Sequence, residues 1–418
     1  MIPLQRIREE PDVIREGARL KGESAPVDEI VELDARARRL RTEMESTRAE
    51  QNAASKQIHG KPSPEQITEL SRLKERVREL EGEVTTLEGR IAELLLAVPN
   101  PPHPGVPVGR DPEDNVVVRS WGEVPRFDFT PLPHHELGER LGIFDFERAA
   151  KLSGARFAVL RGHGAQLQRA LVTFMLHLAA TRDYEEISPP YLVRREAMVG
   201  TGQLPKFEDD AFHADDGLFL IPTAEVPVTN LYREEILDAA ALPIRHVAFT
   251  PCWRREAGAA GKDTRGYLRL HQFEKVELVK FTTPETSLDE LESLVDDAET
   301  VLRELGLHHR VMLMCTGDTG FAQWKKYDVE AWAPGLQRWL EVSSCSVYAD
   351  FQARRANIRY RPGPGERPRF VHTLNGSALG VPRTFDALLE TYQRSDGSVE
   401  VPAVLRPYMA GIEQVRRA

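Results

Sequence analysis

Cationic side chains are concentrated in Cys252–Glu277, which reads CWRREAGAAGKDTRGYLRLHQFEKVE. The whole chain carries a net charge of −10, so the concentration is local. It fits either a solvated loop or a cradle for a polyanion such as a nucleotide. CWRRE and HQFEKVE both look like strands, which would put Arg254 and Glu256 on one face, where an arginine fork suits a phosphate or a carboxylate. Phe273 would offer a flat face to a base, although core packing is the commoner role of such an aromatic residue.

A phosphate-binding P-loop is excluded, although GAAGKDT looks like one. That motif requires four residues between its first glycine and the GK pair, and the residue at that spacing here is Glu256. The chain also lacks a GxGxxG after a strand and an HExxH. Any nucleotide must therefore be bound by a site of another kind.

Two further segments combine hydroxyls with carboxylates. In IPTAEVPVTN, Thr223 and Glu225 are two residues apart, so on a strand they would share one side and could hold a small ligand with an ammonium group. An ordinary exposed strand pair is the alternative. LEVSSCS places Glu341 before two hydroxyls, and HTLNGSALGVPRT adds a small-residue loop and the lone Arg383. Carboxylate and hydroxyl oxygens suit a hard cation such as Mg²⁺ that bridges phosphates.

Composition narrows the class of protein. The chain has 418 residues, enough for two or three domains, and its 41% hydrophobic and 29% charged residues are ordinary for a soluble globular protein. It has neither a signal-peptide-like apolar region nor a run of about 18 apolar residues, so no membrane segment is expected. The three cysteines are widely spaced without a CxxC, which favours a reducing cytoplasm over a disulfide framework or a thiolate zinc site.

A helical hairpin is predicted for residues 28–97. Apolar or small residues recur there in alternating steps of three and four, the seam of a left-handed coiled coil. The seam positions are Ile30, Leu33, Ala37, Leu40, Met44, Thr47, Gln51, Ala54 and Ile58, then Leu70, Leu73, Val77, Leu80, Val84, Leu87, Ile91 and Leu94. Between them, Gly60 can end the first helix, and Ser63, Pro64 and Gln66 provide an N-cap, a proline at N1 and a capping box.

Two helices of about 30 residues joined by so short a turn must run antiparallel, as an arm roughly 45 Å long. A dimerisation coiled coil or a spacer is the plain interpretation of such an arm. Its faces outside the seam are densely charged, however, so the arm must be mostly solvated and free to contact another molecule. The cations are Arg36, Arg38, Arg39, Arg41, Arg72, Lys74, Arg76 and Arg78.

The proline- and glycine-rich segment 98–115 marks a linker, so we predict an N-terminal domain at residues 1–110 and a second domain at 111–418. In the second domain the expected strands come in consecutive runs rather than alternating with helices. This order favours an α+β domain built on an antiparallel sheet over a doubly wound parallel sheet. Strands are expected at 218–221, 246–250, 267–281 and 338–348, and helices at 167–178, 285–305 and from Thr384.

Taken together, these segments resemble seryl-tRNA synthetase of the bacterial type. The arm, PPYLV, GTGQLPKF, PTAEVP, CWRRE…HQFEKVE, LEVSSCS and TLNGSALGVPRT follow in that order over essentially the whole chain. Pro190, Arg254 and Arg383 look like the markers of the three signatures of class II aminoacyl-tRNA synthetases, whereas the HIGH- and KMSKS-type signatures of class I are missing. Ala378 departs mildly from the third signature, where a glycine is frequent. The resemblance implies a class II catalytic domain after the arm, with a mostly antiparallel sheet flanked by helices.

The resemblance also implies a role for each candidate residue. The serine-binding residues would be Thr223, Ala224, Glu225, Glu277 and Ser377, with Glu277 at the amino group. The ATP-binding residues would be Arg254, Arg255, Glu256, Leu270, Phe273, Glu341, Val342, Ser343, Ser344 and Arg383. Of these, Arg254 and Arg383 would be catalytic, and Glu341 and Ser344 would hold Mg²⁺. Strict strand alternation places Ser344 on the face opposite Glu341, so a bulge near 342–344 is needed if both bind one ion.

The implied reaction forms seryl-adenylate from L-serine and ATP, then transfers serine to the 3′ end of tRNA(Ser), and of tRNA(Sec) where the host has it. The arm would hold the tRNA, and the 257–266 loop would fold over ATP and then meet the acceptor end. The resemblance further implies a cytoplasmic homodimer, with residues 167–190 at the interface.

Three other functions compete. A paralogue that charges a carrier protein would lack the arm, and a non-enzymatic regulator would lose Arg254, Glu277 or Arg383. A purely structural coiled-coil protein leaves about 300 residues beyond the linker unexplained.

Overall fold

The computed structural model describes residues 1–58, 60–257 and 266–417, and the chain divides into two compact units, 1–101 and 102–418. The expectations for the 257–266 loop therefore fall almost entirely outside the described residues. No helix in these described ranges is long and apolar enough to cross a membrane.

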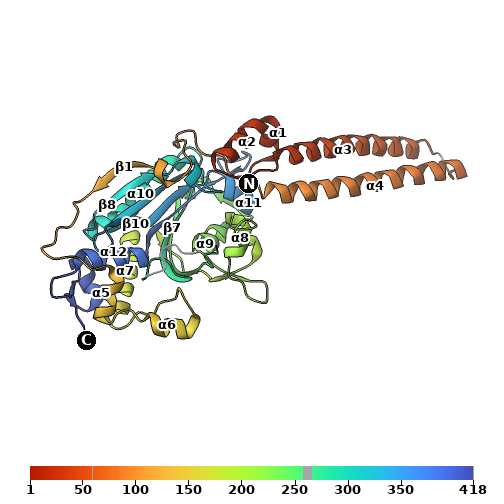
Figure 1. Ribbon diagram of the computed structural model, residues 1–418. Helices are drawn as coiled ribbons and strands as arrows, with labels where there is room; N and C mark the ends of the chain where they lie inside the picture. Colours follow the sequence, from red (N-terminus) through yellow and green to blue (C-terminus); the bar gives the residue numbers. More distant parts are fainter. Residues whose placement is uncertain (59, 258–265, 418) are drawn as a thin grey trace. The chain divides into compact units, whose positions relative to one another are not determined.

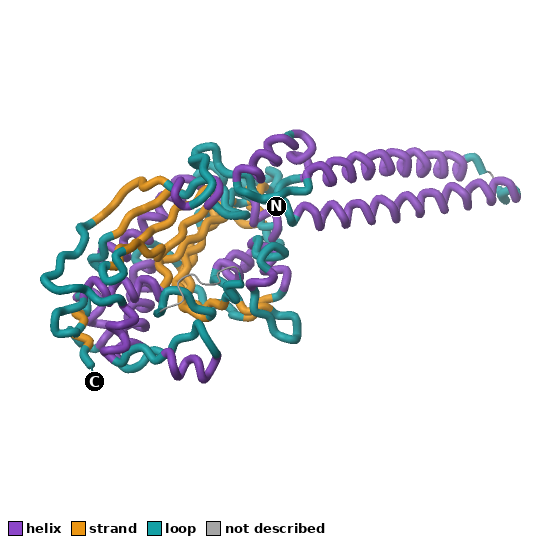
Figure 2. The backbone as a smooth tube through the Cα atoms, viewed as in Figure 1, coloured by secondary structure: helices purple, strands orange, loops and turns teal. Residues whose placement is uncertain are grey.

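The first unit is helical and contains the predicted hairpin. Figure 2 shows its two long helices running side by side. All the seam positions of these two helices are buried or half-buried, which confirms the coiled-coil pattern. The second helix begins with the predicted capping box, in which Ser63 and Gln66 each accept from the other's backbone N–H, at 3.3 and 2.9 Å. The four helices are α1 (Leu4–Glu9), α2 (Pro11–Leu20), α3 (Val27–Lys56) and α4 (Pro64–Leu95).

One expectation about the arm needs correction. The helix α3 ends at Lys56, so Gly60 is not the residue that terminates it, and the seam position Ile58 lies beyond its end. Most of the arm's predicted cations pair with carboxylates of the same hairpin, and their side chains stay well exposed, as expected for a solvated arm. These pairs are Arg36–Glu83, Arg38–Asp34, Arg41–Glu88, Arg72–Glu69 and Arg76–Glu43.

The second unit is built on an eight-stranded sheet in the order β1-β8-β9-β10-β13-β7-β6-β2. Every neighbouring pair in this sheet is antiparallel except β2 with β6, which confirms the predicted α+β class. The strands are β1 (Val116–Trp121), β2 (Glu185–Glu186), β6 (Ile244–Trp253), β7 (Gln272–Thr282), β8 (His309–Leu313), β9 (Lys325–Ala333), β10 (Arg338–Val347) and β13 (His372–Gly380).

Three helices, α7 (His163–Ala180), α10 (Ser287–Glu304) and α12 (Val381–Tyr392), cover one face of this sheet (Figure 1). Their apolar residues form the main core with alternate residues of the strands, such as Val276 and Leu278 of β7. Lys275 and Glu277 alternate with these two residues along β7, so they must face the other side of the sheet. Farther along β7, that other side is also covered, because Val279 and Phe281 belong to a second core. At the centre of the sheet, the face opposite the main core is polar and is not covered by the second core.

Shorter elements surround the sheet. The remaining helices are α5 (His134–Leu141), α6 (Phe146–Ser153), α8 (Arg195–Thr201), α9 (Glu225–Thr229) and α11 (Phe351–Ala356). The small sheets are formed by β3 (Leu192–Val193) with β4 (Phe219–Leu220), by β12 (Arg369–Phe370), β11 (Arg359–Arg361) and β5 (Ile236–Asp238), and by β14 (Val399–Glu400) with β15 (Gln414–Val415).

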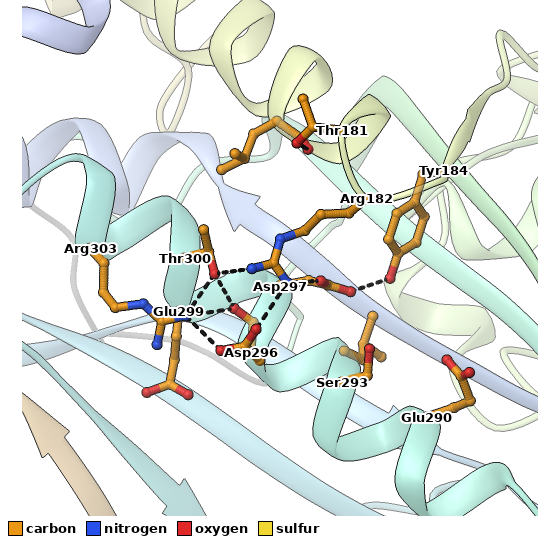
Figure 3. Close-up of polar contacts among 12 residues, drawn as sticks. Thr181, Arg182, Tyr184, Glu290, Ser293, Asp296, Asp297, Glu299, Thr300 and Arg303 are labelled. Atoms are coloured by element: carbon orange, nitrogen blue, oxygen red, sulfur yellow. Dashed lines mark hydrogen bonds and ion pairs between the residues drawn. The ribbon is translucent and has the colours of Figure 1, made fainter.

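A network of charged groups fixes α10 against the sheet. Figure 3 shows Arg182 donating to Asp296, Asp297 and Thr300, at 2.9, 2.5 and 2.7 Å. Lys280 of β7 is fully buried, and its ammonium lies 2.9 Å from Glu290 and 3.7 Å from Asp297. Ammonium and carboxylates compensate one another, which makes burying these charges tolerable.

Candidate active site

A pocket of about 410 Å³ occupies the open face of the large sheet. Its lining comes from β7, β9, β10 and β13, from the first turns of α9 and α12, and from the segments that follow α8 and β6 and precede β7 and β9. Thirteen of the residues predicted from the sequence line it: Thr223, Glu225, Arg254, Glu256, Leu270, Phe273, Glu277, Glu341, Val342, Ser343, Ser344, Ser377 and Arg383.

Two predicted residues do not line the pocket. Ala224 is fully buried in the second core, so its side chain is not available to a ligand. The Arg255 guanidinium lies 4.5 Å from the Phe212 ring centroid, and its Nε donates to the carbonyl of Ala211 at 3.0 Å. Arg255 therefore binds the loop before β4 rather than the pocket.

The deep end of the pocket contains two carboxylates and a lysine. Glu277 pairs with Lys275 two residues earlier on β7, and Ser377 lies opposite Glu277 in the β13–β7 register. Glu225 is also buried, at 6% exposure. Its burial and the nearby charge of Glu277 raise the pKa of Glu225 to about 7. Two carboxylates against one lysine leave a negative charge, so this end of the pocket favours a cation.

The prediction that Thr223 and Glu225 lie on a strand is wrong. Glu225 begins α9, and the Thr223 hydroxyl accepts from the Glu225 backbone N–H at 3.2 Å. The two side chains reach the same pocket because a helix starts there, and strand alternation has no part in it. Two-residue spacing alone could not distinguish these cases.

The prediction that one strand carries both Arg254 and Glu256 is also wrong. β6 ends at Trp253, and Glu256 has a positive φ of 54°, which no regular strand contains. Arg254 continues the ladder by one hydrogen bond, from its N–H to the carbonyl of His271 at 3.0 Å. Its guanidinium lies 5.1 Å from the centroid of the Phe273 ring, while the Glu256 carboxylate accepts from Nε of Arg269 at 2.6 Å.

The bulge required at 342–344 is present. In the β10–β9 register Glu341 faces Glu330 and Ser343 faces Val329, so Val342 is the extra residue. The extra residue brings Glu341 and Ser344 to the same pocket despite their odd spacing. Burial raises the pKa of Glu341, but the positive charges of Arg383, Lys326 and Arg254 outweigh it and hold this pKa below its usual value. Glu341 is therefore ionised.

The oxygen donors here fit a Mg²⁺ ion that is shared with phosphates. Among the described residues, no group of three or more His, Cys, Asp and Glu side chains could hold a metal by itself. Glu341 and Ser344 supply one carboxylate and one hydroxyl, and Oδ1 of Asp328, opposite Ser344, is a buried oxygen without a hydrogen-bond partner in the described structure. Mg²⁺ commonly binds through one or two protein oxygens plus phosphates and water.

Arg383 reaches the pocket from the first turn of α12. The segment HTLNGSALG, which we expected to be a small-residue loop, is instead β13, and it leads directly into α12. Arg383 donates from Nη1 to the carbonyl of Glu341 at 2.9 Å, and this nitrogen lies 3.4 Å from the Glu341 carboxylate. The first helical turn thus places a cation above the proposed metal ligand.

Several lining residues were not found from the sequence. Lys275 and Lys326 bring positive charge, and Tyr348 and Asn375 bring polar groups. A signal existed for Lys275, since it precedes Glu277 by two residues on a strand and must share its face. Asn375 likewise precedes Ser377 by two residues, but this signal was missed because the segment 372–380 was expected to be a loop.

Comparison with known proteins identifies both units. Residues 1–102 match the family model of the seryl-tRNA synthetase N-terminal domain. Residues 206–392 match that of the class II tRNA synthetase core domain for G, H, P, S and T.

Relatives and solved structures match over the full length. The serine–tRNA ligase of Thermomicrobium roseum is 56% identical, covering 100% of this chain and 95% of the relative, and that of Geobacter sulfurreducens is 52% identical, covering 99% and 100%. The crystal structure of seryl-tRNA synthetase from Pyrococcus horikoshii complexed with ATP is 39% identical, with a TM-score of 0.96 and complete coverage of both chains. The resemblance seen in the sequence is thereby confirmed, and the chain belongs to the seryl-tRNA synthetase family.

Proposed function

We propose that this enzyme activates L-serine with ATP to form seryl-adenylate and pyrophosphate, and then transfers the serine to the 3′ end of tRNA(Ser). The observation that carries the proposal is the pocket itself. One end combines two carboxylates with a serine hydroxyl, and the other end carries two arginines and an ionised carboxylate. An amino acid and a nucleotide triphosphate present the complementary charges.

Serine binds at the deep end. Its ammonium group lies against Glu277 and Glu225, and the hydroxyls of Thr223 and Ser377 border the same space. The negative charge left by two carboxylates and Lys275 is balanced when the ammonium arrives. The serine carboxylate then points toward Arg254.

ATP binds at the other end, with Phe273 beside the adenine, Glu256 accepting from its amino group and Leu270 bordering it. The serine carboxylate attacks the α-phosphorus and pyrophosphate leaves. Arg254 stabilises the charge on the α-phosphate, and Arg383 stabilises the charge that passes to the leaving group. When bound, Mg²⁺ at Glu341 and Ser344 neutralises phosphate charge. Neither step requires a protein nucleophile, because holding the reactants in line supplies much of the acceleration.

In the second step the 3′-terminal hydroxyl of the tRNA attacks the acyl carbon and AMP leaves. We assign tRNA binding to the coiled-coil arm of residues 28–97 and to the loop 257–266, and a host tRNA(Sec) is a substrate of the same kind. Of the arm's cations predicted above, Arg39, Lys74 and Arg78 are exposed and have no ion-pair partner among the described residues. Free surface cations of this kind contact phosphates and read shape more than sequence.

We further propose a homodimer that acts in the cytoplasm. The edge strand β1 exposes Val116, Val117 and Val118, at 46%, 46% and 41%, and an apolar edge of this kind is usually covered by a partner. Leu167 and Leu171 of the α7 stripe are buried inside the unit, so within 167–190 an interface would use the exposed residues of α7, such as Arg169 and His177, and those of the segment that follows it. All three cysteines are free and buried, as suits a reducing compartment. Light scattering tests the dimer, and a mass of 47.1 kDa rather than twice that value argues against it.

The direct test is ATP–pyrophosphate exchange with each of the twenty amino acids, with Mg²⁺ and without tRNA. We expect exchange with serine well above all others. Exchange with another amino acid contradicts the assignment of the deep end, and absence of exchange with all twenty contradicts the proposal as a whole. Charging of tRNA(Ser) by the active enzyme then tests the second step.

A further inference from the structure

Glu225 owes its position to a buried partner outside the pocket lining. Its Oε1 accepts from Nε2 of Gln352 at 2.5 Å. Gln352 lies on α11 and is fully buried, and more than 120 residues separate it from Glu225 in the sequence. Buried amides in proteins are nearly always hydrogen-bonded, and this one makes one of its hydrogen bonds to a carboxylate that lines the pocket.

The orientation of the Gln352 amide is fixed by two further hydrogen bonds. Its Nε2 also donates to the backbone carbonyl of Thr201 at 3.1 Å, and its Oε1 accepts from the hydroxyl of Thr373 at 2.6 Å. Thr201 and Thr373 are themselves 1% and 0% exposed. Rotating the amide by half a turn would point Oε1 at two acceptors, the Thr201 carbonyl and the Glu225 carboxylate. The amide therefore has a single acceptable orientation, with its NH₂ group toward Glu225.

We propose that Gln352 is a positioning residue for serine selection, which holds the Glu225 carboxylate in place and in its charged form so that it can receive the ammonium group of the amino acid. The inference rests on the proposed function and names a residue that never touches the substrate. Thr373 belongs to the same hydrogen-bond network, since its hydroxyl keeps the Gln352 amide from turning.

The charged form of Glu225 needs this help. The titratable groups that face it are Glu277 and Lys275 on β7 and Tyr348 after β10. Burial and the charge of Glu277 raise the pKa of Glu225 to about 7, and the Gln352 hydrogen bond is the first opposing influence, ahead of Lys275. The carboxylate that must meet an ammonium group is thus close to neutralisation at physiological pH.

The sign of the effect on activity follows from this balance. Glu225 attracts an ammonium group only when ionised, so kcat/KM for serine falls as the pH is lowered through about 7. Replacing Gln352 with a side chain that cannot donate raises the pKa of Glu225 further. The acid limb of the profile then moves to higher pH, by about one unit, because a hydrogen bond to a charged group is of that strength.

The test compares Gln352→Met, which keeps the length and removes the donor, with the wild type in serine-dependent ATP–pyrophosphate exchange across pH 5.5–9. We expect KM for serine to rise about 10- to 100-fold at neutral pH, with KM for ATP little changed and the acid limb displaced upward. Thr373→Val should give a smaller change in the same direction, and it keeps the test available if Gln352→Met does not fold. Arg354→Met on the same helix is the matched control, because Arg354 pairs with Asp350.

If KM for serine and KM for ATP rose equally and the acid limb of the pH profile did not move, Gln352 would only support the fold. That result would overturn the inference. Unchanged kinetics in both Gln352→Met and Thr373→Val would overturn it as well. The proposed function is judged separately, by the exchange activity of the wild type, so the two can fail independently.

Discussion

At the scale of single residues, we propose that catalysis depends on two arginines that reach the pocket from different elements. Arg383 is held by the Glu341 carbonyl and carboxylate at the start of α12, and Arg254 lies over the Phe273 ring. Both guanidinium groups are oriented before any substrate arrives. Preorganised charge of this kind stabilises a transition state without the cost of reorganisation.

Replacing Arg383 with alanine should lower kcat for adenylate formation by about 10²-fold or more, the scale seen when one preorganised charge or donor is removed. Pre-steady-state formation of seryl-adenylate measures this step directly. Arg394→Ala is the control, because Arg394 follows the same helix but pairs with Glu400 away from the pocket. A loss of the same size in both variants would mean that the helix and not the charge is responsible.

At the scale of elements, the site depends on how α10 is attached to the sheet that carries it. Lys280 is fully buried and lies among Glu290, Ser293 and Asp297 of α10, while Arg182 and Tyr184 contact the same helix from the segment after α7 (Figure 3). Each of the two carboxylates thus lies near this ammonium and also pairs with an arginine, Glu290 with Arg245 and Asp297 with Arg182.

Lys280→Met should reduce the free energy of unfolding by about 1–3 kcal/mol, since the buried carboxylates lose one hydrogen-bonded cation while Arg245 still pairs with Glu290 and Arg182 with Asp297. Denaturant unfolding monitored by circular dichroism measures the change. Lys151→Met removes a pair with Glu147 whose side chains are 68% and 82% exposed, so we expect it to change stability by less than about 1 kcal/mol. Similar values for the two variants would contradict the role given to burial.

At the scale of the whole molecule, we propose that the two compact units divide the reaction between them. Every residue assigned to serine or ATP lies in the unit 102–418, and the coiled-coil arm lies in the unit 1–101. Adenylate formation needs only the residues assigned to serine and ATP, whereas aminoacylation needs the tRNA to be held as well.

Removal of residues 30–97 should leave serine-dependent pyrophosphate exchange within a few-fold of the wild type and abolish charging of tRNA(Ser). Joint loss of both activities in a folded protein would count against this division. A milder variant, with Arg39, Lys74 and Arg78 changed to alanine, should raise KM for tRNA and reduce the dependence of binding on salt by about one ion for each phosphate that is no longer neutralised. Arg72→Ala is its control, since Arg72 pairs with Glu69.

The sequence by itself determined several features that depend on neighbours along the chain. The seam of the hairpin, the capping box at Ser63, the strands β7 and β10 and the order of the family motifs all follow from local spacing. Even the bulge at Val342 could be anticipated, because the family resemblance assigns Glu341 and Ser344 to one ion although their spacing is odd.

The tertiary structure alone decided which groups meet. Thr223 and Glu225 converge at the start of a helix, Arg255 turns away to Ala211, and Gln352 reaches Glu225 from another element, none of which spacing reveals. Several of the arm's arginines likewise find partners on the opposite helix. The physical reason is that local periodicity fixes the face on which a side chain lies, whereas its partner depends on packing between elements far apart in the chain.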